Sequence, residues 1–236
     1  MMAAYPWVGG IMLYDDEVNI RPDLPDLLDM LGEEARRHDL VYRGFFKSGK
    51  KYMTRELFQR FYDAGFRYLC TGAESAHPDV LRLVGKGATV ADNTDFIRLC
   101  CEVGIKAKVC TQIGLPGETA ETAETNRRWI MEMAERYGLS DFDVTITTPT
   151  SGTPLYENPE KFKDLISFNK AELESNTKAC NYKGTPGQYH SYVETRGVHG
   201  EKGLTRAEIV AWRQYIEDSG RRAASLPALV GGKDDG

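Results

Sequence analysis

Long apolar segments and blocks of one charge are both missing from this sequence. No uncharged apolar run among its 236 residues approaches the ~20 residues that a membrane-spanning helix needs, and the first residues do not form a secretory signal. Lys and Arg total 30 against 35 Asp and Glu, and no Lys/Arg block is long enough to hold nucleic acid or anionic lipid. We therefore expect a cytoplasmic protein that does not enter a membrane and for which nucleic acid is not a favoured partner.

Cysteine is scarce, and its spacing excludes the common cysteine-based sites. The five cysteines are Cys70, Cys100, Cys101, Cys110 and Cys180, an odd number without a disulfide framework and without any C-x-x-C pair. Zinc-ribbon and thioredoxin-like classes lose their main support. Reduced thiols in a reducing compartment are the better interpretation.

Five short apolar runs rich in β-branched and aromatic residues alternate with helical patterns. The runs cover residues 11–14, 41–46, 66–71, 107–115 and 142–148, and they indicate buried strands. The main helical patterns cover residues 24–35, 54–65, 89–104, 119–138 and 205–220, and four of them begin at a threonine and end at a glycine. Alternating strands and helices predict an α/β fold with a parallel sheet.

The pattern weakens after residue 148. The stretch 151–203 holds one short helix candidate, built on Phe162, Leu165 and Ile166, and residues after Ser219 are expected to form a tail. We expect three segments: a partial barrel over 1–156, an extension with helices over 157–220, and a disordered tail over 221–236.

Polar or Gly/Pro-rich residues follow every apolar run, and this pattern predicts where a site lies. In a parallel α/β sheet the C-terminal strand ends share one edge, where the connecting loops converge on a ligand. For any one end, a simple cap or turn is an equal alternative. At Glu118 the favoured alternative is a carboxylate that complements the helix starting at Thr119, and at Glu74 the alternative is the same role at the Pro78 helix.

Several of these ends resemble motifs of the radical S-adenosylmethionine enzymes, in the branch that often carries an N-terminal cobalamin-binding domain. The residues that carry the resemblance are Gly72-Ala73-Glu74-Ser75, Leu81 to Lys86, Gly104-Ile105, Ile113 to Thr119, Asp15-Asp16 and Thr148 to Tyr156, with Ser151 where the family usually has Pro. Together they cover about residues 10–155. The resemblance implies a partial parallel (β/α) barrel without its first strand, followed by an irregular C-terminal α extension.

The resemblance also implies a binding site for S-adenosylmethionine, the small-molecule cosubstrate of the family. Asp15 and Asp16 would lie beside the methionine amine, with Lys47 offering a cation to the carboxylate. Glu74 and Ser75 would contact the ribose and methionine, Ile113 with Gly114 would pack on the adenine, and Thr148 and Pro149 would lie along the nucleoside. The chemistry is compatible, because carboxylates suit an ammonium group and an apolar strand residue beside glycine suits the flat face of a purine.

The family's Cys-x-x-x-Cys-x-x-Cys loop, whose thiolates hold a 4Fe-4S cluster, is missing, since the cysteine spacings here are 30, 1, 9 and 70. We expect no metal ligands in this chain and a fragment that is inactive alone. The complete protein would carry the cluster, with cobalamin as a possible cofactor on a missing N-terminal domain. It would cleave S-adenosylmethionine to a deoxyadenosyl radical or transfer methyl groups through cobalamin, on a substrate the sequence does not identify.

Two alternatives from other classes stay open. The chain could be a non-catalytic nucleotide-binding or scaffold module derived from such a barrel. It could also be an unrelated barrel lyase or isomerase that uses Glu74 and Lys47 as acid and base, although the motif spacings argue against this class.

Overall fold

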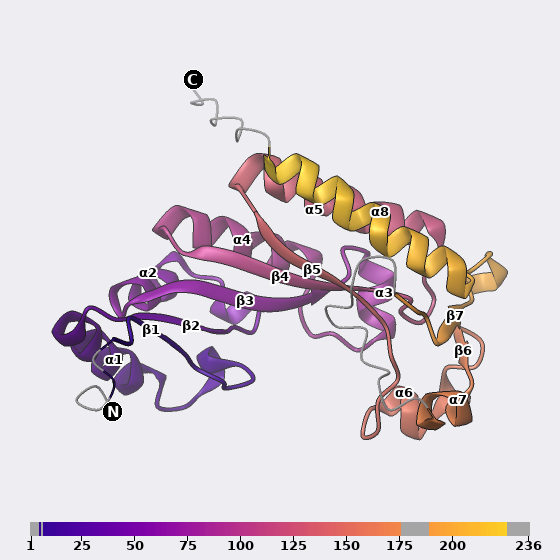
Figure 1. Ribbon diagram of the computed structural model, residues 1–236, viewed down its shortest axis with the longest axis horizontal. Helices are drawn as coiled ribbons and strands as arrows, with labels where there is room; N and C mark the ends of the chain where they lie inside the picture. Colours follow the sequence, from indigo (N-terminus) through magenta and orange to yellow (C-terminus); the bar gives the residue numbers. More distant parts are fainter. Residues whose placement is uncertain (1–4, 6, 176–188, 226–236) are drawn as a thin grey trace.

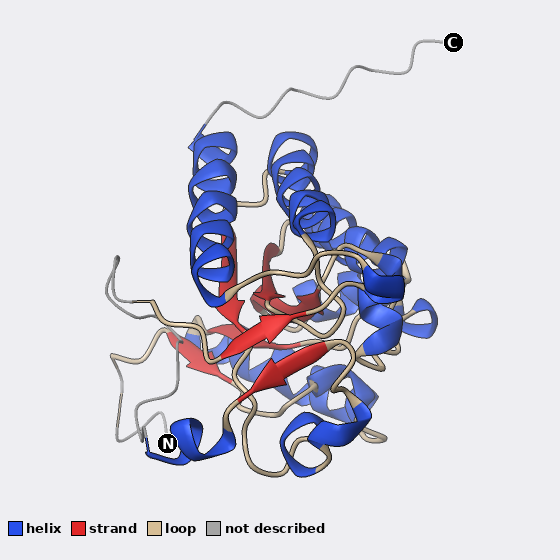
Figure 2. Cartoon of the chain, turned by 90° about the vertical axis from the view of Figure 1, so that its right-hand side faces the viewer, coloured by secondary structure: helices blue, strands red, loops and turns tan. Residues whose placement is uncertain are grey.

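The computed structural model describes residues 5, 7–175 and 189–225, and its centre is a sheet of five parallel strands in the order of the chain. The strands are β1 (Gly10–Met12), β2 (Val41–Phe45), β3 (Phe66–Glu74), β4 (Lys106–Ile113) and β5 (Asp141–Ile146). Figure 1 shows them fanned across the molecule, and Figure 2 shows that they curl, so the sheet forms a half-barrel. The α/β class and the five predicted strands are confirmed.

Helices connect the strands and cover one face of the sheet. They are α1 (Leu24–His38), α2 (Arg55–Asp63), α3 (Pro78–Leu83), α4 (Val90–Val103) and α5 (Ala120–Tyr137). Thr54, Thr89 and Thr119 cap α2, α4 and α5 by accepting a backbone N–H, as predicted. The helix starts are therefore set by local sequence.

A cluster of phenylalanines holds the helices to the outer face of the sheet. Phe46 follows β2, and its ring centroid lies 5.0 Å from that of Phe58 in α2 and 5.6 Å from that of Phe96 in α4. Phe61 in α2 lies 4.9 Å from Phe66 in β3. Because all five rings are fully or almost fully buried, this cluster is the centre of the core.

The C-terminal part adds a second, two-stranded sheet and a long helix. Its elements are α6 (Pro154–Glu157), β6 (Ile166–Phe168), α7 (Lys170–Ser175), β7 (Val193–Thr195) and α8 (Arg206–Ser225), and β6 pairs antiparallel with β7. The helix expected around Phe162 and Ile166 was therefore wrong. Ile166 belongs to a strand because its pairing partner, Thr195, lies far along the chain.

Helix α8 lies beside α5 (Figure 1) and ends later than its sequence predicts. It continues to Ser225 instead of ending at Gly220, and residues 226–236 lie outside the described part. A Cβ at Gly220 would come within 2.5 Å of Phe142 and 2.7 Å of Ile130. This glycine therefore allows close packing of the helix and does not terminate it. No helix in the described part is long and apolar enough to cross a membrane.

Candidate functional site

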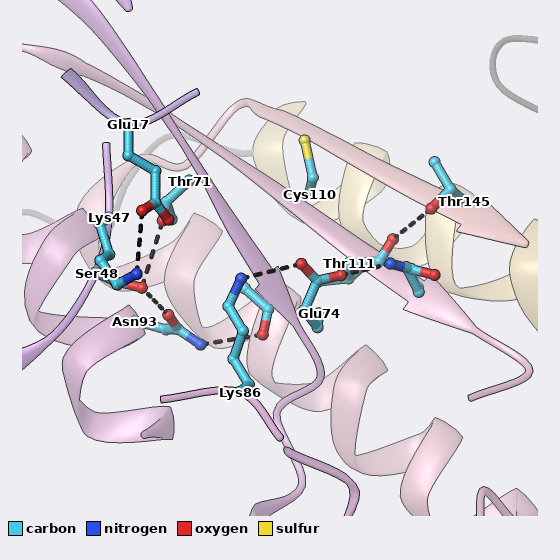
Figure 3. Close-up of polar contacts among 12 residues, drawn as sticks. Glu17, Lys47, Ser48, Thr71, Glu74, Lys86, Asn93, Cys110, Thr111 and Thr145 are labelled. Carbon is cyan, nitrogen blue, oxygen red and sulfur yellow. Dashed lines mark hydrogen bonds and ion pairs between the residues drawn. The ribbon is translucent and has the colours of Figure 1, made fainter. Parts of the chain in front are cut away.

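The inner face of the half-barrel, opposite the phenylalanine cluster, is polar. Alternate residues of the central strands point toward it, since side chains alternate between the two faces of a strand. In β4 these residues are Lys108, Cys110 and Gln112, whereas Val109 and Ile113 between and after them are completely buried. Figure 3 shows the part of this face that carries Glu74, Cys110 and Thr145. Polar residues on one face of a central strand are typical of a ligand-binding site.

Glu74, the last residue of β3, is held by two side chains from other parts of the chain. Its Oε1 lies 3.1 Å from Lys86 Nζ (Figure 3). Its Oε2 accepts a hydrogen bond from Gln112 Nε2 at 2.6 Å. Its backbone is left-handed, with φ of 58°, which is uncommon for a residue other than glycine. Glu74 therefore does not serve the Pro78 helix, because its carboxylate turns to the inner face.

The ends of β1 and β2 bring a second set of predicted residues together. Asp15 pairs with Arg21 at 2.8 Å, and Lys47 pairs with Glu17 at 3.0 Å. The backbone N–H of Lys47 also donates to the buried side chain of Asn19 at 2.7 Å. Two of the predicted charges are thus already balanced by neighbours.

The remaining residue of this group, Asp16, is exposed. No ion pair joins its carboxylate to a described residue, whereas Asp15 beside it is paired with Arg21. Asp16 is therefore the carboxylate of this group whose charge is open to a cationic ligand.

Ser75 is buried and joins a polar network behind the strand ends. Its hydroxyl donates to Asn126 Oδ1 at 3.2 Å and accepts the backbone N–H of His77 at 3.1 Å. Asn126, in α5, also accepts the N–H of Ala76 at 2.5 Å and donates to Glu118 at 3.3 Å. Ser75 thus fixes the loop after β3 from inside.

Glu118 is fully buried in this network, and its carboxylate faces the turn before the helix, whereas the sequence favoured a carboxylate that complements the N-terminus of the helix starting at Thr119. Its carboxylate accepts the backbone N–H groups of Gly114 at 2.5 Å and Leu115 at 3.1 Å, in the turn before the helix. Burial raises the pKa of Glu118 to about 8, against the effect of these two hydrogen bonds. The residue therefore shapes the turn after β4.

The other predicted contacts lie at the ends of β4 and β5. Ile113 is completely buried in the core, and Gly114 has φ of 89°, with the Val193 and Ile209 side chains within 3.3 Å of where its Cβ would be. The hydroxyl of Thr148 donates to the carbonyl of Ile146 at 3.3 Å, and Pro149 is buried. At these positions the backbone, more than the side chain, lies at the strand-end edge.

A separate charged cluster occupies the opposite edge of the inner face, where the strands begin. Lys108 lies 2.8 Å from Asp143 and 3.5 Å from Asp141, and Tyr68 donates to Asp141 at 2.5 Å. Hydrogen bonding to Asp143 raises the pKa of Lys108, although burial opposes this. The cluster lines a hollow of about 280 Å³, whose wall includes Arg43.

The thiols of the described residues do not form a metal site. Cys70 and Cys110 face each other across β3 and β4 with sulfurs 3.6 Å apart, while buried Cys100 and exposed Cys101 lie on α4. In the described residues, no group of three or more His, Cys, Asp or Glu side chains could hold a metal ion. The four cysteines of the described part therefore do not fit the three converging thiolates that a 4Fe-4S cluster needs.

Sequence reasoning missed Gln112 and Thr147 and did not assign Lys86 to the site. The hydroxyl of Thr147 donates to Gln112 Oε1 at 3.3 Å, so a line of contacts runs from Lys86 through Glu74 and Gln112 to β5. A signal was present, because the polar residues Lys108 and Gln112 lie an even number of positions apart, on one face of a strand predicted to be buried.

Comparison with known proteins gives a consistent picture. The model of a family described as the radical SAM superfamily matches residues 1–130, more than half of the chain. An uncharacterized methyltransferase of Pyrococcus horikoshii is 32% identical over 107 residues, which are 45% of this chain and 22% of that protein. The chain thus matches about a fifth of the length of this curated relative.

Two solved structures share the fold. TsrM from Kitasatospora setae, a radical S-adenosylmethionine methyltransferase with cobalamin and a 4Fe-4S cluster bound, is 20% identical, with a TM-score of 0.58 over 86% of this chain and 41% of its own. Coproporphyrinogen III oxidase (HemN) from Escherichia coli, described as a radical SAM enzyme, is 12% identical, with a TM-score of 0.56 over 90% of this chain and 41% of its own. At these identities the likeness concerns the fold.

Proposed function

Because the chain belongs to the radical SAM superfamily, we propose that the C-terminal ends of β1–β5 bind S-adenosylmethionine as a small-molecule cosubstrate. The observation that carries this proposal is the placement of Glu74, whose carboxylate is held at the inner face of the half-barrel by Lys86 and Gln112. A carboxylate fixed at the edge where parallel strands end is suited to hold the polar part of a nucleoside ligand.

Each remaining residue has a part in this proposal. Asp16, with Asp15 beside it, balances the charge of the ligand's methionine amine. Lys47 leaves its ion pair with Glu17 and binds the carboxylate of the ligand's methionine. The backbone at Ile113 and Gly114 packs on the adenine, and Thr148 and Pro149 follow the nucleoside. Ser75 contributes by fixing the loop from behind.

The cysteine spacings of the sequence do not match the family's cluster loop, and the cysteines of the described residues do not converge on a metal, so we assign this chain no step of the one-electron chemistry that a cluster supplies when bound. We propose that the thiolate ligands come from residues outside this sequence and that the chain alone does not cleave S-adenosylmethionine. Cobalamin-dependent methyl transfer is the proposed class for the complete enzyme. TsrM is named as a methyltransferase with cobalamin bound, and the Pyrococcus relative is named as a methyltransferase.

The cysteine arrangement also favours one second candidate. A chain that keeps the strand ends but has no cluster ligands could act as a non-catalytic nucleotide-binding or scaffold module. This candidate shares the predicted ligand site and differs in that no added polypeptide would restore cleavage.

Calorimetry with S-adenosylmethionine tests the proposal on the full chain. We expect weak, saturable binding with a Kd of about 1 mM, equivalent to about −4.1 kcal/mol, and a clear loss in Glu74→Ala. The matched control is Glu102→Ala, an exposed carboxylate on α4. Binding that is indifferent to Glu74→Ala, or no binding at all, would refute the assignment of this edge.

A further inference from the structure

We propose that Lys86 and Gln112 are positioning residues, which set the orientation of the Glu74 carboxylate toward its ligand. This inference rests on the proposed binding of S-adenosylmethionine at the strand ends. The two residues come from different elements, Lys86 from the loop between α3 and α4 and Gln112 from β4. Each contacts a different carboxylate oxygen, Oε1 and Oε2 respectively. Because each oxygen has its own donor, the Glu74 carboxylate is fixed in one orientation.

The amide of Gln112 is itself oriented by a third strand. Its Oε1 accepts a hydrogen bond from the hydroxyl of Thr147 at 3.3 Å, so its Nε2 faces Glu74, to which it donates at 2.6 Å. A hydrogen bond from an amide to a carboxylate is stronger than one between neutral groups. The end of β5 thus determines, through Gln112, where the carboxylate at the end of β3 lies.

Gly72 provides the space that this arrangement needs. A Cβ built on Gly72 would lie 2.7 Å from Glu74 Oε1 and 3.2 Å from Lys86 Nζ. The carboxylate and the ammonium group therefore fold back over the strand backbone at the one residue without a side chain. Any larger residue there would displace the carboxylate while leaving both charged groups in the protein.

The backbone of Glu74 shows that the position is constrained. Glu74 has a left-handed backbone with φ of 58°, a strained conformation for a residue with a side chain, and such a conformation persists where its surroundings over-determine it. The contacts with Lys86 and Gln112 are surroundings of that kind, because they join Glu74 to the next loop and to the next strand. Lys86 also neutralises the charge of the Glu74 carboxylate. The remaining lone pairs of that carboxylate can therefore face a ligand without leaving an uncompensated charge at the strand end.

The experiment combines a direct readout of the contact with a readout of ligand binding, both on the full chain. The variants are Lys86→Met, Gln112→Leu and Gly72→Ala. Their controls are Lys106→Met, an exposed lysine at the start of β4, and Gly87→Ala, where an added Cβ meets nothing within 4 Å. The Gln112 side-chain amide is followed by proton–nitrogen NMR, with Gln112→Leu identifying its signals, and affinity for S-adenosylmethionine is measured by calorimetry.

We expect a downfield Gln112 amide proton that moves upfield in Glu74→Ala, Lys86→Met and Gly72→Ala. Affinity should fall about tenfold in Lys86→Met and in Gln112→Leu, with an unchanged melting temperature. Lys86→Arg should recover part of that affinity, because it keeps the cation, and both controls should behave like the wild type. A merely structural role would lower the melting temperature and would not be rescued by arginine.

Two negative results are distinguishable. If the wild-type chain binds S-adenosylmethionine and Lys86→Met and Gln112→Leu bind it equally well, the positioning role is wrong and the proposed function stands. If the wild-type chain does not bind it, the proposed function falls and the positioning role falls with it. A Gln112 amide signal that Glu74→Ala leaves unchanged would overturn the inference whatever the affinities.

Discussion

The carboxylate of Glu118 lies 3.3 Å from the side-chain amide of Asn126, and both side chains are buried behind the strand ends. Through this contact the turn after β4 is joined to the loop after β3, because Asn126 also holds Ser75 and the backbone of Ala76. The two loops that carry the proposed ligand contacts therefore share one buried connection. Changes to either side chain should be felt at the strand ends.

The first prediction concerns pH. Glu118 has a pKa of about 8 in the folded protein and an ordinary value of 4.5 when unfolded, so the folded state holds the extra proton between these values. Its contribution to the free energy of unfolding is fully present below about pH 4.5 and is lost as the pH rises through 8. Urea unfolding at pH 5, 6.5 and 8 should therefore show decreasing stability.

The control for this prediction is Glu118→Gln, which cannot ionise. Its free energy of unfolding should lack that part of the decrease between pH 5 and pH 8. The same slope in the wild type and in Glu118→Gln would mean that other groups cause the pH dependence.

The second prediction concerns Asn126. Asn126→Ala removes the acceptor of the Ala76 N–H and Ser75 hydroxyl and the donor to Glu118, so it leaves buried polar groups unpaired. We expect a loss of about 1–3 kcal/mol in the free energy of unfolding, the usual cost of an unsatisfied buried group. Arg128→Ala, exposed on the same helix, should change it by less than about 0.5 kcal/mol. Equal effects of the two substitutions would show that the network adds no stability.

Much of the fold could be predicted because its signals are local. Thr89 and Gly104 mark the ends of α4 correctly, since capping and a left-handed C-terminal residue depend on neighbours in the chain. The polar strand ends were also visible, because they directly follow the apolar runs. Lys86 was noticed only as part of a motif, since its contact with Glu74 depends on how the intervening loop folds.

The errors share a different cause, because they depend on contacts between distant residues. Ile166 is a strand residue because β7 pairs with it, and Gly220 lies inside a helix at a point of close packing against Phe142 and Ile130. Glu118 was interpreted as a carboxylate that complements the following helix because the turn that directs the Gly114 and Leu115 N–H groups toward it is not visible in the sequence. The structure at these positions therefore depends on pairing and packing between residues far apart in the sequence.

The third prediction follows from Gly220. In an open helix position, replacing glycine by alanine stabilises a protein by about 0.4–1 kcal/mol. Here the new Cβ would come within 2.5 Å of Phe142 and 2.7 Å of Ile130, so Gly220→Ala should instead destabilise the protein by about 1–3 kcal/mol. Chemical denaturation gives the sign directly. A stabilised variant would mean that α8 does not pack on β5 and α5 as described.

The fourth prediction concerns metal content. A 4Fe-4S cluster of this kind needs three thiolates on one shaped loop, and the cysteine spacings of 30, 1, 9 and 70 supply no such triple. Anaerobic reconstitution of the full chain with iron and sulfide should therefore give no stable brown chromophore and far fewer than about 4 iron atoms per chain. The measurements are iron and sulfide content and the near-visible absorbance after gel filtration. The sulfurs of Cys70 and Cys110 lie 3.6 Å apart and could hold some iron loosely. The double variant Cys70→Ser with Cys110→Ser should lose any iron that is bound in this way. Stoichiometric uptake in the wild type that survives gel filtration would contradict the prediction and would place cluster ligands in this chain after all.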